Sequence, residues 1–390
     1  MRGYFALNNQ RIVAVDLETG KHNEIGPGTR PVYSPTGHLL HANEFGLAAT
    51  PFSIETLVAT GDTFSVQEAG DRVSLSQDGT LVYLDRARGG DTFSLVWRDR
   101  AGELLETIGQ PQPSMTHLAL SPDGRWLAVA GREGGNEDIW IHGVERPTKT
   151  RLTFADRLDR GATWSPNGKD IAFASTSDGQ LDIFSKPADG SGEAVPLLAT
   201  SLGEFVTDWS TDGQYLLYDR HSPDSSLADI WYLKRKPDGS GYDPVVFLET
   251  LFEERAAKFS PDGRYVVYAS NETGQYEVYV RTFPSGEGKW QVSVNGGSQP
   301  RWSRDGKEIF YGYGDTLLSV AVTLDPTFRL GTPEELFQSV GLWQPNSNLP
   351  RYDVSADGKR FIIREPAGDL TTTIRVVENW YEEFRNREQD

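Results

Sequence analysis

A short motif that recurs along the whole chain constrains the fold more than any other feature. Each copy begins with Ser, ends with Gly and carries Asp, Asn or Thr at the third position: SPTG (34–37), SQDG (76–79), SPDG (121–124), SPNG (165–168), STDG (210–213), SPDG (260–263), SRDG (303–306) and SADG (355–358). Successive Ser residues are 42, 45, 44, 45, 50, 43 and 52 residues apart, an average of about 46. A period in this range predicts the blades of a β-propeller, each a four-stranded sheet.

The residues around the motif predict a strand on each side of it. The residue before Ser is apolar in every copy: Tyr33, Leu75, Leu120, Trp164, Trp209, Phe259, Trp302 and Val354. The third and fifth residues after each Gly are also apolar, which is the i, i+2 pattern of a strand with one buried face. Within the turn, Pro sets φ, Asp or Asn binds local backbone, and Gly takes the positive φ that a type I turn with a following bulge requires. A third strand often begins with an acid, as in Asp138-Ile139-Trp140 and Glu277-Val278-Tyr279.

These repeats predict an all-β fold, a β-propeller of eight four-stranded blades in one domain over residues 1–390. Seven blades with an irregular segment is the alternative. We expect the strands before the first motif to share a blade with those after the last motif, because this arrangement closes the ring and leaves no free sheet edge. No linker or low-complexity segment divides the chain.

The repeat φ-S-P-D-G-[RK]-x-[ILV]-x-[FYV], followed by [DE]-[IV]-[WYF], resembles the TolB-like (PD40, WD40-like) propellers along nearly the whole chain. Longer stretches, among them LVWRDRAGE (95–103), EVYVRTFPSGEGKWQVS (277–293) and GGSQPRWSRDGKEIFY (296–311), resemble the C-terminal propeller of bacterial membrane-anchored serine/threonine kinases and of stand-alone relatives. That resemblance implies an extracytoplasmic or periplasmic sensing or protein-binding domain without catalysis of its own. The kinase motifs HRD and DFG do not occur in the sequence, so kinase activity is not implied.

The composition argues against several classes of partner and chemistry. Asp and Glu number 56 against 38 Lys and Arg, a formal net charge of −18. A surface this acidic repels phosphate backbones and anionic lipid, so we expect neither nucleic acid nor a membrane as partner. The absence of Cys excludes disulfides, thiol catalysis and Cys-ligated metal, and we expect no cofactor and no metal site. The first residues show no signal peptide, and no apolar run predicts a membrane-spanning helix.

The candidate site lies at the start of the strand before each motif, because this strand is innermost in a propeller and lines the central channel. Arg or His stands four or five residues before Ser in six copies, and Lys or Arg stands two residues before it in two. The candidate ligand-binding residues are therefore Arg30, Arg72, His117, Arg160, Arg255, Lys258, Arg301 and Arg351. Convergent guanidinium groups suit carboxylates or phosphates. The alternative is that these residues pair internally with Asp71, Asp208, Asp353 or Glu254 and hold the blades together.

The sequence thus predicts a monomeric, non-enzymatic binding or sensing propeller that recognises a protein partner or a small anionic ligand through one face and the channel mouth. Two alternatives stay open. One is an enzyme, a lyase or hydrolase, acting on an acidic oligosaccharide or another anion in the channel; the other is a structural assembly module. Neither G-x-S-x-G nor H-E-x-x-H occurs in the sequence, and no catalytic residue is predicted. Trp343, in the irregular segment GLWQPN, is a further candidate for an exposed contact.

Overall fold

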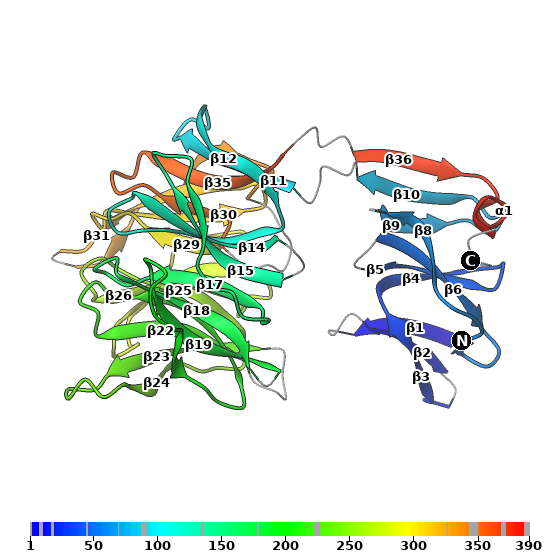
Figure 1. Ribbon diagram of the computed structural model, residues 1–390, viewed down its shortest axis with the longest axis horizontal. Coiled ribbons are helices and arrows are strands. Elements are labelled where there is room, and N and C mark those ends of the chain that lie inside the picture. Colours follow the sequence, from blue (N-terminus) through cyan, green and yellow to red (C-terminus); the bar gives the residue numbers. More distant parts are fainter. Residues whose placement is uncertain are drawn as a thin grey trace. The chain divides into compact units, whose positions relative to one another are not determined.

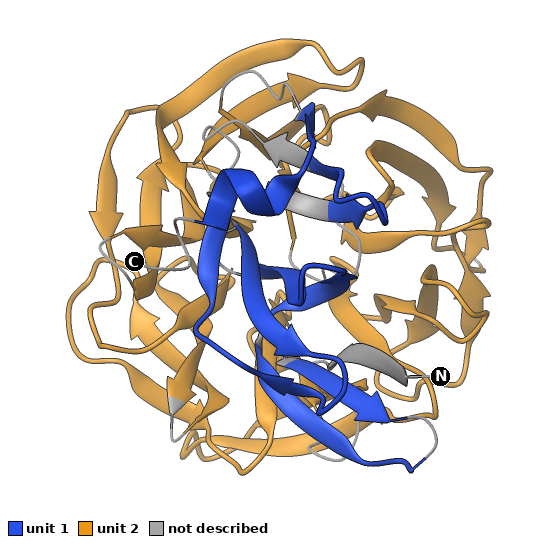
Figure 2. Cartoon of the chain, turned by 90° about the vertical axis from the view of Figure 1, so that its right-hand side faces the viewer, with its two compact units in different colours: residues 1–90, 368–390 blue, residues 91–367 orange. Residues whose placement is uncertain are grey.

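β-strands make up nearly all of the regular structure that is described, as the apolar i, i+2 pattern predicts (Figure 1). The computed structural model describes residues 2–7, 11–16, 19–43, 46–68, 70–86, 92–133, 136–177, 179–221, 227–325, 327–342, 350–367 and 372–385, so Trp343 lies outside the described residues. The chain divides into two compact units, residues 1–90 with 368–390 (unit 1) and residues 91–367 (unit 2), coloured separately in Figure 2. The prediction of one propeller domain over residues 1–390 stays a prediction.

In unit 2, the described strands form six antiparallel sheets, which are arranged radially in the orange part of Figure 2. Five of the six are built from consecutive strands, and in each the first strand ends at a motif Ser or next to it. They are β13 (Met115–Leu120), β14 (Trp126–Glu133), β15 (Asn136–Gly143) and β16 (Lys149–Arg151); β17 (Asp159–Trp164), β18 (Asp170–Ser177), β19 (Gln180–Pro187) and β20 (Val195–Leu198); β21 (Gly203–Trp209), β22 (Tyr215–His221), β23 (Ala228–Arg235) and β24 (Tyr242–Leu248); β25 (Glu254–Phe259), β26 (Tyr265–Ser270), β27 (Glu277–Thr282) and β28 (Lys289–Gln291); and β29 (Ser298–Trp302), β30 (Glu308–Tyr313), β31 (Thr316–Thr323) and β32 (Arg329–Leu330), with β33 (Glu334–Gln338) on β31.

The sixth sheet joins the two ends of unit 2. Its strands run in the order β12 (Leu104–Pro113), β11 (Thr92–Asp99), β35 (Arg360–Pro366) and β34 (Tyr352–Val354). β11 and β35 pair antiparallel, from Phe93 opposite Pro366 to Asp99 opposite Arg360. This pairing closes the ring of unit 2, because it joins the strands that follow its last hairpin to those that precede its first.

The prediction that the chain termini share a blade is wrong for the strands that are described. The first strands, β1 (Arg2–Leu7), β2 (Arg11–Asp16) and β3 (His22–Pro27), form a sheet of their own, whereas the hairpin of the last motif belongs to the sheet that closes unit 2. The counts of eight or seven blades are not confirmed, because unit 2 has six sheets and unit 1 has three among the described residues. Among the described residues a motif lies in a hairpin of eight of the nine sheets, and the sheet of β1–β3 has none.

Unit 1 contains the two N-terminal motif copies and the end of the chain. Beside β1–β3, one sheet consists of β9 (Gly70–Leu75), β10 (Leu81–Arg86) and β36 (Thr372–Val377). The other consists of β4 (Thr29–Ser34), β5 (His38–Asn43), β6 (Gly46–Ser53) and β7 (Val58–Ala59), with β8 (Phe64–Glu68) on β6. The short helix α1 (Trp380–Phe384) buries Trp380 and Phe384 in the core of this unit, and Trp380 Nε1 donates a hydrogen bond to Ser34 Oγ (3.1 Å).

The motif folds in unit 2 as its residues predict. In the copy at 260–263, Ser260 Oγ donates to Asp262 Oδ1 (2.6 Å) and accepts the N–H of Tyr265 (2.9 Å). The Gly263 N–H donates to the carbonyl of Ser260 (2.9 Å), and Gly263 has a φ of +71°. The other copies of unit 2 repeat the Ser contacts. The repeated turn therefore closes the inner hairpin of each sheet and has a structural role.

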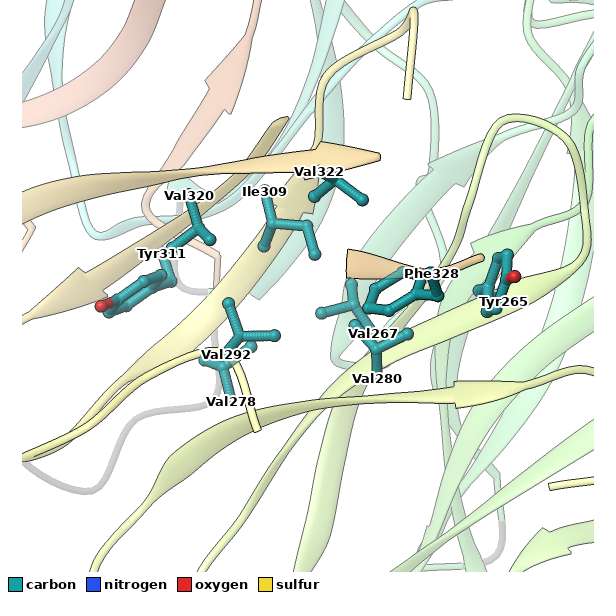
Figure 3. Packing of buried hydrophobic residues seen from close by; sticks show 10 residues of the cluster. All are labelled: Tyr265, Val267, Val278, Val280, Val292, Ile309, Tyr311, Val320, Val322 and Phe328. Atoms are coloured by element: carbon teal, nitrogen blue, oxygen red, sulfur yellow. The ribbon is translucent and has the colours of Figure 1, made fainter. Parts of the chain in front are cut away.

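Apolar side chains of neighbouring sheets interlock to form the core between them. Figure 3 shows one of these clusters, in which side chains of the β25–β28 sheet meet those of the β29–β33 sheet. Its buried members include Val267, Val278, Val280, Ile309, Tyr311 and Val320. Such layers hold the sheets side by side, and the strand before each motif of unit 2 faces the centre of that unit.

Candidate functional site

The innermost strands of all six sheets of unit 2 border one cavity of about 470 Å³. β13, β17, β21, β25, β29 and β34 each contribute lining residues, which identifies this space, the channel cavity, with the centre of the ring. The turns that contain Pro122, Pro166 and Pro261 also line it. Its volume falls within the range of small-molecule and side-chain binding sites, about 300–1,000 Å³.

Four charged side chains line the channel cavity at equivalent positions, each two residues before a motif Ser. They are Asp208, Lys258, Arg301 and Asp353, in β21, β25, β29 and β34. Lys258 Nζ lies 3.6 Å from Asp208 Oδ1, and Arg301 Nε lies 3.6 Å from Asp353 Oδ1. These separations are longer than the 2.7–2.9 Å or so of a charge-assisted hydrogen bond. The two cations are therefore close to carboxylates without being fully engaged by them.

Asp208 and Asp353 also accept backbone hydrogen bonds from the innermost strand of a neighbouring sheet. Asp208 Oδ2 accepts the backbone N–H of Phe259 (2.9 Å), and Asp353 Oδ2 accepts that of Leu120 (2.7 Å). Burial lowers the pKa of Lys258 from its usual value, and the charge of Asp208 offsets part of this effect. The predicted internal pairing with Asp208 and Asp353 is thus present, although the ion pairs are loose.

Two rings meet at the end of the channel cavity farthest from the motif turns. The ring centroids of His117 and Phe205, from the non-adjacent strands β13 and β21, are 4.9 Å apart. Phe205 also packs on Gly161, where an added Cβ would stand 2.5 Å from Phe205 Cζ. Burial and the positive charges nearby hold the pKa of His117 well below its usual 6.5. A neutral imidazole and a phenyl ring therefore form the floor of the cavity.

Asp219 is the other carboxylate that lines the channel cavity. Its Oδ2 accepts the N–H of Ala256 (3.1 Å), whereas Oδ1 is buried without a hydrogen-bond partner. Burial raises the pKa of Asp219 to about 7, an effect that the bond from Ala256 and the charges of Arg255 and Lys258 partly oppose. Near neutral pH this group can accept or donate a proton in a hydrogen bond to a ligand.

The structure divides the predicted site residues into three groups. His117, Lys258 and Arg301 line the channel cavity, whereas Arg160, Arg255 and Arg351 belong to unit 2 but not to that lining. Arg30, exposed in β4, and Arg72, in β9, belong to unit 1; the side chain of Arg72 lies outside the described part of the structure. The prediction of one common mouth is therefore not met within unit 2, and a ligand-binding role for these residues stays a prediction.

Ion pairs within unit 2 engage two of the arginines that do not line the cavity. Arg160 Nη2 lies 2.8 Å from Glu137 Oε2, and Arg255 forms an ion pair with Glu253. The guanidinium carbon of Arg255 also lies 4.6 Å from the centroid of the Tyr276 ring. The internal-pairing alternative therefore describes Arg160 and Arg255, although their partners differ from those predicted. Arg351 has no such partner among the described residues.

Phe205, Asp219 and Arg364 lie at or near the centre of unit 2 and were not predicted from the sequence. Phe205 stands five residues before Ser210, a position equivalent to those of Arg160 and Arg255, so the aromatic residue there is a usable signal. Asp219 lies opposite Phe205 in the β21–β22 register. Arg364 lies opposite Arg351 in the backbone pairing of the last hairpin, and its position near the centre follows from the register of that hairpin.

Radial sheets around a lined central cavity define the class of protein: it is a multi-bladed β-propeller. The propeller is TolB-like. The TolB candidate of Agrobacterium tumefaciens matches with a TM-score of 0.57 at 19% identity, over 71% of this chain and 99% of that chain. The hydrazine synthase of Kuenenia stuttgartiensis matches with a TM-score of 0.50 at 17% identity, over 80% of this chain and 95% of that chain. At these identities the similarity concerns the fold alone.

Three proteins are similar to this chain in sequence, each over part of its length. The uncharacterized protein Atu1656 of Agrobacterium fabrum is 27% identical over 256 residues, 61% of this chain and 83% of that protein. The uncharacterized peptidase YuxL of Bacillus subtilis is 25% identical over 196 residues, 41% of this chain and 30% of that protein. The Tol-Pal system protein TolB of Anaeromyxobacter dehalogenans is 28% identical over 114 residues, 27% of this chain and 24% of that protein. The match spans less than a third of the length of the last two proteins. No family model matches the chain.

Neither a membrane-spanning helix nor a cluster of metal ligands is found in the described residues. None of the helices in this part of the chain is long and apolar enough to cross a membrane. Among the same residues, no three His, Asp or Glu side chains are grouped closely enough to hold a metal ion.

Proposed function

We propose that unit 2 is a non-enzymatic binding module that recognises an acidic group of a protein partner through the channel cavity and the turns around it. The observation that carries this proposal is the position of Lys258 and Arg301, which line a cavity of about 470 Å³ while their nearest carboxylate oxygens are 3.6 Å away. Lys258 Nζ donates to the carbonyl of Thr207 and Arg301 Nη1 to that of Pro300 (2.9 Å), so both cations have neutral acceptors and no carboxylate as close. A carboxylate of the partner that entered the cavity would supply the charge-assisted hydrogen bond that each still lacks.

The arrangement of charge favours an acidic group over a basic one. Asp208 and Asp353 already accept backbone N–H groups, so their oxygens are partly satisfied. Burial raises the pKa of Asp219 to about 7, which weakens its repulsion of an anion near neutral pH. Arg304, exposed at the rim, adds a positive charge, and its Nη1 donates to the carbonyl of Pro122 (2.6 Å) in a turn from another sheet.

The comparisons support a protein-interaction module in general terms. The fold is TolB-like, and one relative is by name a component of the Tol-Pal system. The peptidase match covers 30% of that protein, so its activity is not carried over to this chain. The acidic specificity and the use of the channel are our own proposal, and they rest on the lining residues.

Site-specific photocross-linking in the cells that produce the protein tests this proposal. A p-benzoyl-phenylalanine at Ala356, an exposed residue that lines the cavity, would cross-link a bound partner. The matched control carries the same probe at Leu251, which is 89% exposed and outside the cavity lining. We expect a discrete product from position 356 only, and we expect Lys258→Met with Arg301→Met to reduce it at least tenfold.

Two results would count against the proposal. Equal cross-linking from both positions would mean that the contact is unspecific, and an unchanged product in the doubly substituted protein would mean that the cations do not recognise the partner. Turnover of an acidic oligosaccharide such as oligogalacturonate by the purified protein, lost in the same variant, would favour the enzymatic alternative instead.

An extracytoplasmic location and a monomeric state belong to the same proposal. The resemblance to extracytoplasmic propellers of bacterial kinases supports the location. The net charge of −18 supports the monomeric state, because like charges oppose self-association. Cell fractionation of the natural protein and sedimentation of the purified chain test them. Recovery in the cytoplasm, or a stable dimer at micromolar concentration, would overturn the respective part.

A further inference from the structure

Two buried arginines face each other at the closure of unit 2. Arg351 immediately precedes β34, and Arg364 lies opposite it in β35, where its N–H donates to the Arg351 carbonyl (3.2 Å). Their residues are only 6% and 5% exposed. Directly opposite residues of an antiparallel pair extend to the same face of the sheet, so the two positive charges are close neighbours.

No carboxylate compensates these charges among the residues that the structure describes. The Nε atoms of both arginines are buried without a hydrogen-bond partner, and Arg351 has no described side-chain hydrogen bond or ion pair. Arg364 donates from Nη1 to the carbonyl of Met115 and covers the ring of Phe93, with the guanidinium carbon 4.0 Å from the ring centroid. A neutral carbonyl and a phenyl ring do not neutralise a guanidinium.

The nearest acidic residues in the sequence are engaged elsewhere. Glu365 accepts hydrogen bonds from Arg98 Nε and Nη2 (2.6 and 2.8 Å) and from Ser339 Oγ (2.6 Å). Asp353 accepts the backbone N–H of Leu120 and lies beside the guanidinium group of Arg301. Burial lowers the pKa of Arg351 to about 10, and burial with the charge of Arg351 lowers the pKa of Arg364 to about 9. Buried charges in proteins are normally paired, and these two arginines have no counter-ion in the part of the chain that the structure describes.

We propose that Arg351 and Arg364 form a binding site for a small oxyanion, a carboxylate or phosphate group that bridges the two guanidinium groups. Guanidinium forks match the oxygens of such anions, which supplies the missing negative charge. The low exposure of both residues favours a small ion over a peptide. Gln112 of the same sheet is likewise buried with both amide atoms unpartnered, and it lies against Gly131 of the neighbouring β14.

This site is independent of the proposed function, because neither arginine lines the channel cavity. The experiment follows thermal unfolding of the full chain while sodium phosphate or sodium malonate is added, against sodium chloride at matched ionic strength. For the wild type we expect at least one of the two oxyanions to raise the unfolding midpoint, by roughly 4–8 °C at a hundredfold excess over Kd. Isothermal titration with the same anion should give one site per chain.

Arg364→Met and Arg351→Met should both abolish the response to the oxyanion. Because each removes a buried charge that has no counter-ion among the described residues, we expect the variants to melt no lower than the wild type in oxyanion-free buffer. The matched control is Arg160→Met, which breaks an ion pair with Glu137 and should lower the midpoint but keep the response. A wild type that responds to chloride as strongly as to both oxyanions would overturn the proposal, and so would a full response in both Arg351→Met and Arg364→Met.

Discussion

Replacing Gly161 with Ala tests whether Phe205 forms the floor of the channel cavity. Gly161 has a φ of +68°, a conformation that costs a residue with a Cβ about 1–2 kcal/mol. The added Cβ would stand 2.5 Å from Phe205 Cζ and 2.8 Å from Cε1, so the ring would have to move. Overpacking of this kind costs about 1–3 kcal/mol. We therefore expect Gly161→Ala to lower the free energy of unfolding of unit 2 by about 2–5 kcal/mol.

Two further variants separate the backbone effect from the steric one. Gly263 has a φ of +71° and no atom within 4 Å of an added Cβ, so Gly263→Ala should cost only the backbone part, about 1–2 kcal/mol. In a Phe205→Ala background the ring is absent, and Gly161→Ala should again cost about 1–2 kcal/mol. The double-mutant cycle of Gly161 and Phe205 should thus give a coupling free energy of about 1–3 kcal/mol.

Urea unfolding followed by tryptophan fluorescence and by far-ultraviolet circular dichroism measures these values, and agreement of the two probes checks for a two-state transition. A coupling below about 0.5 kcal/mol would refute the contact between Phe205 and position 161, because independent sites are additive within that limit. The same conclusion would follow if Gly161→Ala were no more destabilising than Gly263→Ala. Either result would leave the channel cavity without the floor described above.

Two other predictions concern protonation and the motif turn. The pKa of Asp219 rises from 3.8 to about 7 on folding, so the folded chain binds this proton more tightly than the unfolded chain does. The resulting stabilisation is lost as pH rises from 3.8 to about 7, and over this range the wild type should lose unfolding free energy relative to Asp219→Asn. Parallel pH profiles of urea unfolding for the two proteins would contradict this prediction. Ser260→Ala should cost about 1–3 kcal/mol, because it leaves the buried N–H of Tyr265 without an acceptor. The equivalent Ser76→Ala, at an exposed turn, should stay within about 0.5 kcal/mol, and equal losses of unfolding free energy would refute the argument.

The local structure of this chain could be predicted because each part of it depends on a few neighbouring residues. Ser, Asp and Gly of the motif form the turn contacts that their side chains and φ preference suggest, and the flanking apolar residues form the paired strands. The closure of unit 2 could not be predicted in this way. β11 and β35 are joined by pairing between residues such as Val96 and Ile363, and no local pattern indicates which distant strand completes a sheet.

The candidate site shows the same limit. In unit 2 the residues two positions before each motif Ser line the channel cavity, because the turn fixes the register of the strand. Whether an arginine is free or paired depends on carboxylates from other strands, such as Glu137 of β15 beside Arg160 of β17. The position of Arg364 opposite Arg351 could be predicted from the sequence. The turn places Val354 opposite Phe361, and counting outward from this pair places Arg351 opposite Arg364.

The unpaired arginines lie where the two ends of unit 2 meet, and this position gives the proposed anion a physical consequence. Arg364 donates to Met115 of the first sheet, and the carbonyl of Pro350 accepts the N–H of Leu118 (3.2 Å) in the same strand. Repulsion between Arg351 and Arg364 acts directly on the sheet that closes the ring. An anion that binds them in the closed ring and not in the opened one stabilises the closure by its own binding free energy. The ion pairs of Arg160 and Arg255, by contrast, have their carboxylates within the chain and require no ion from solution.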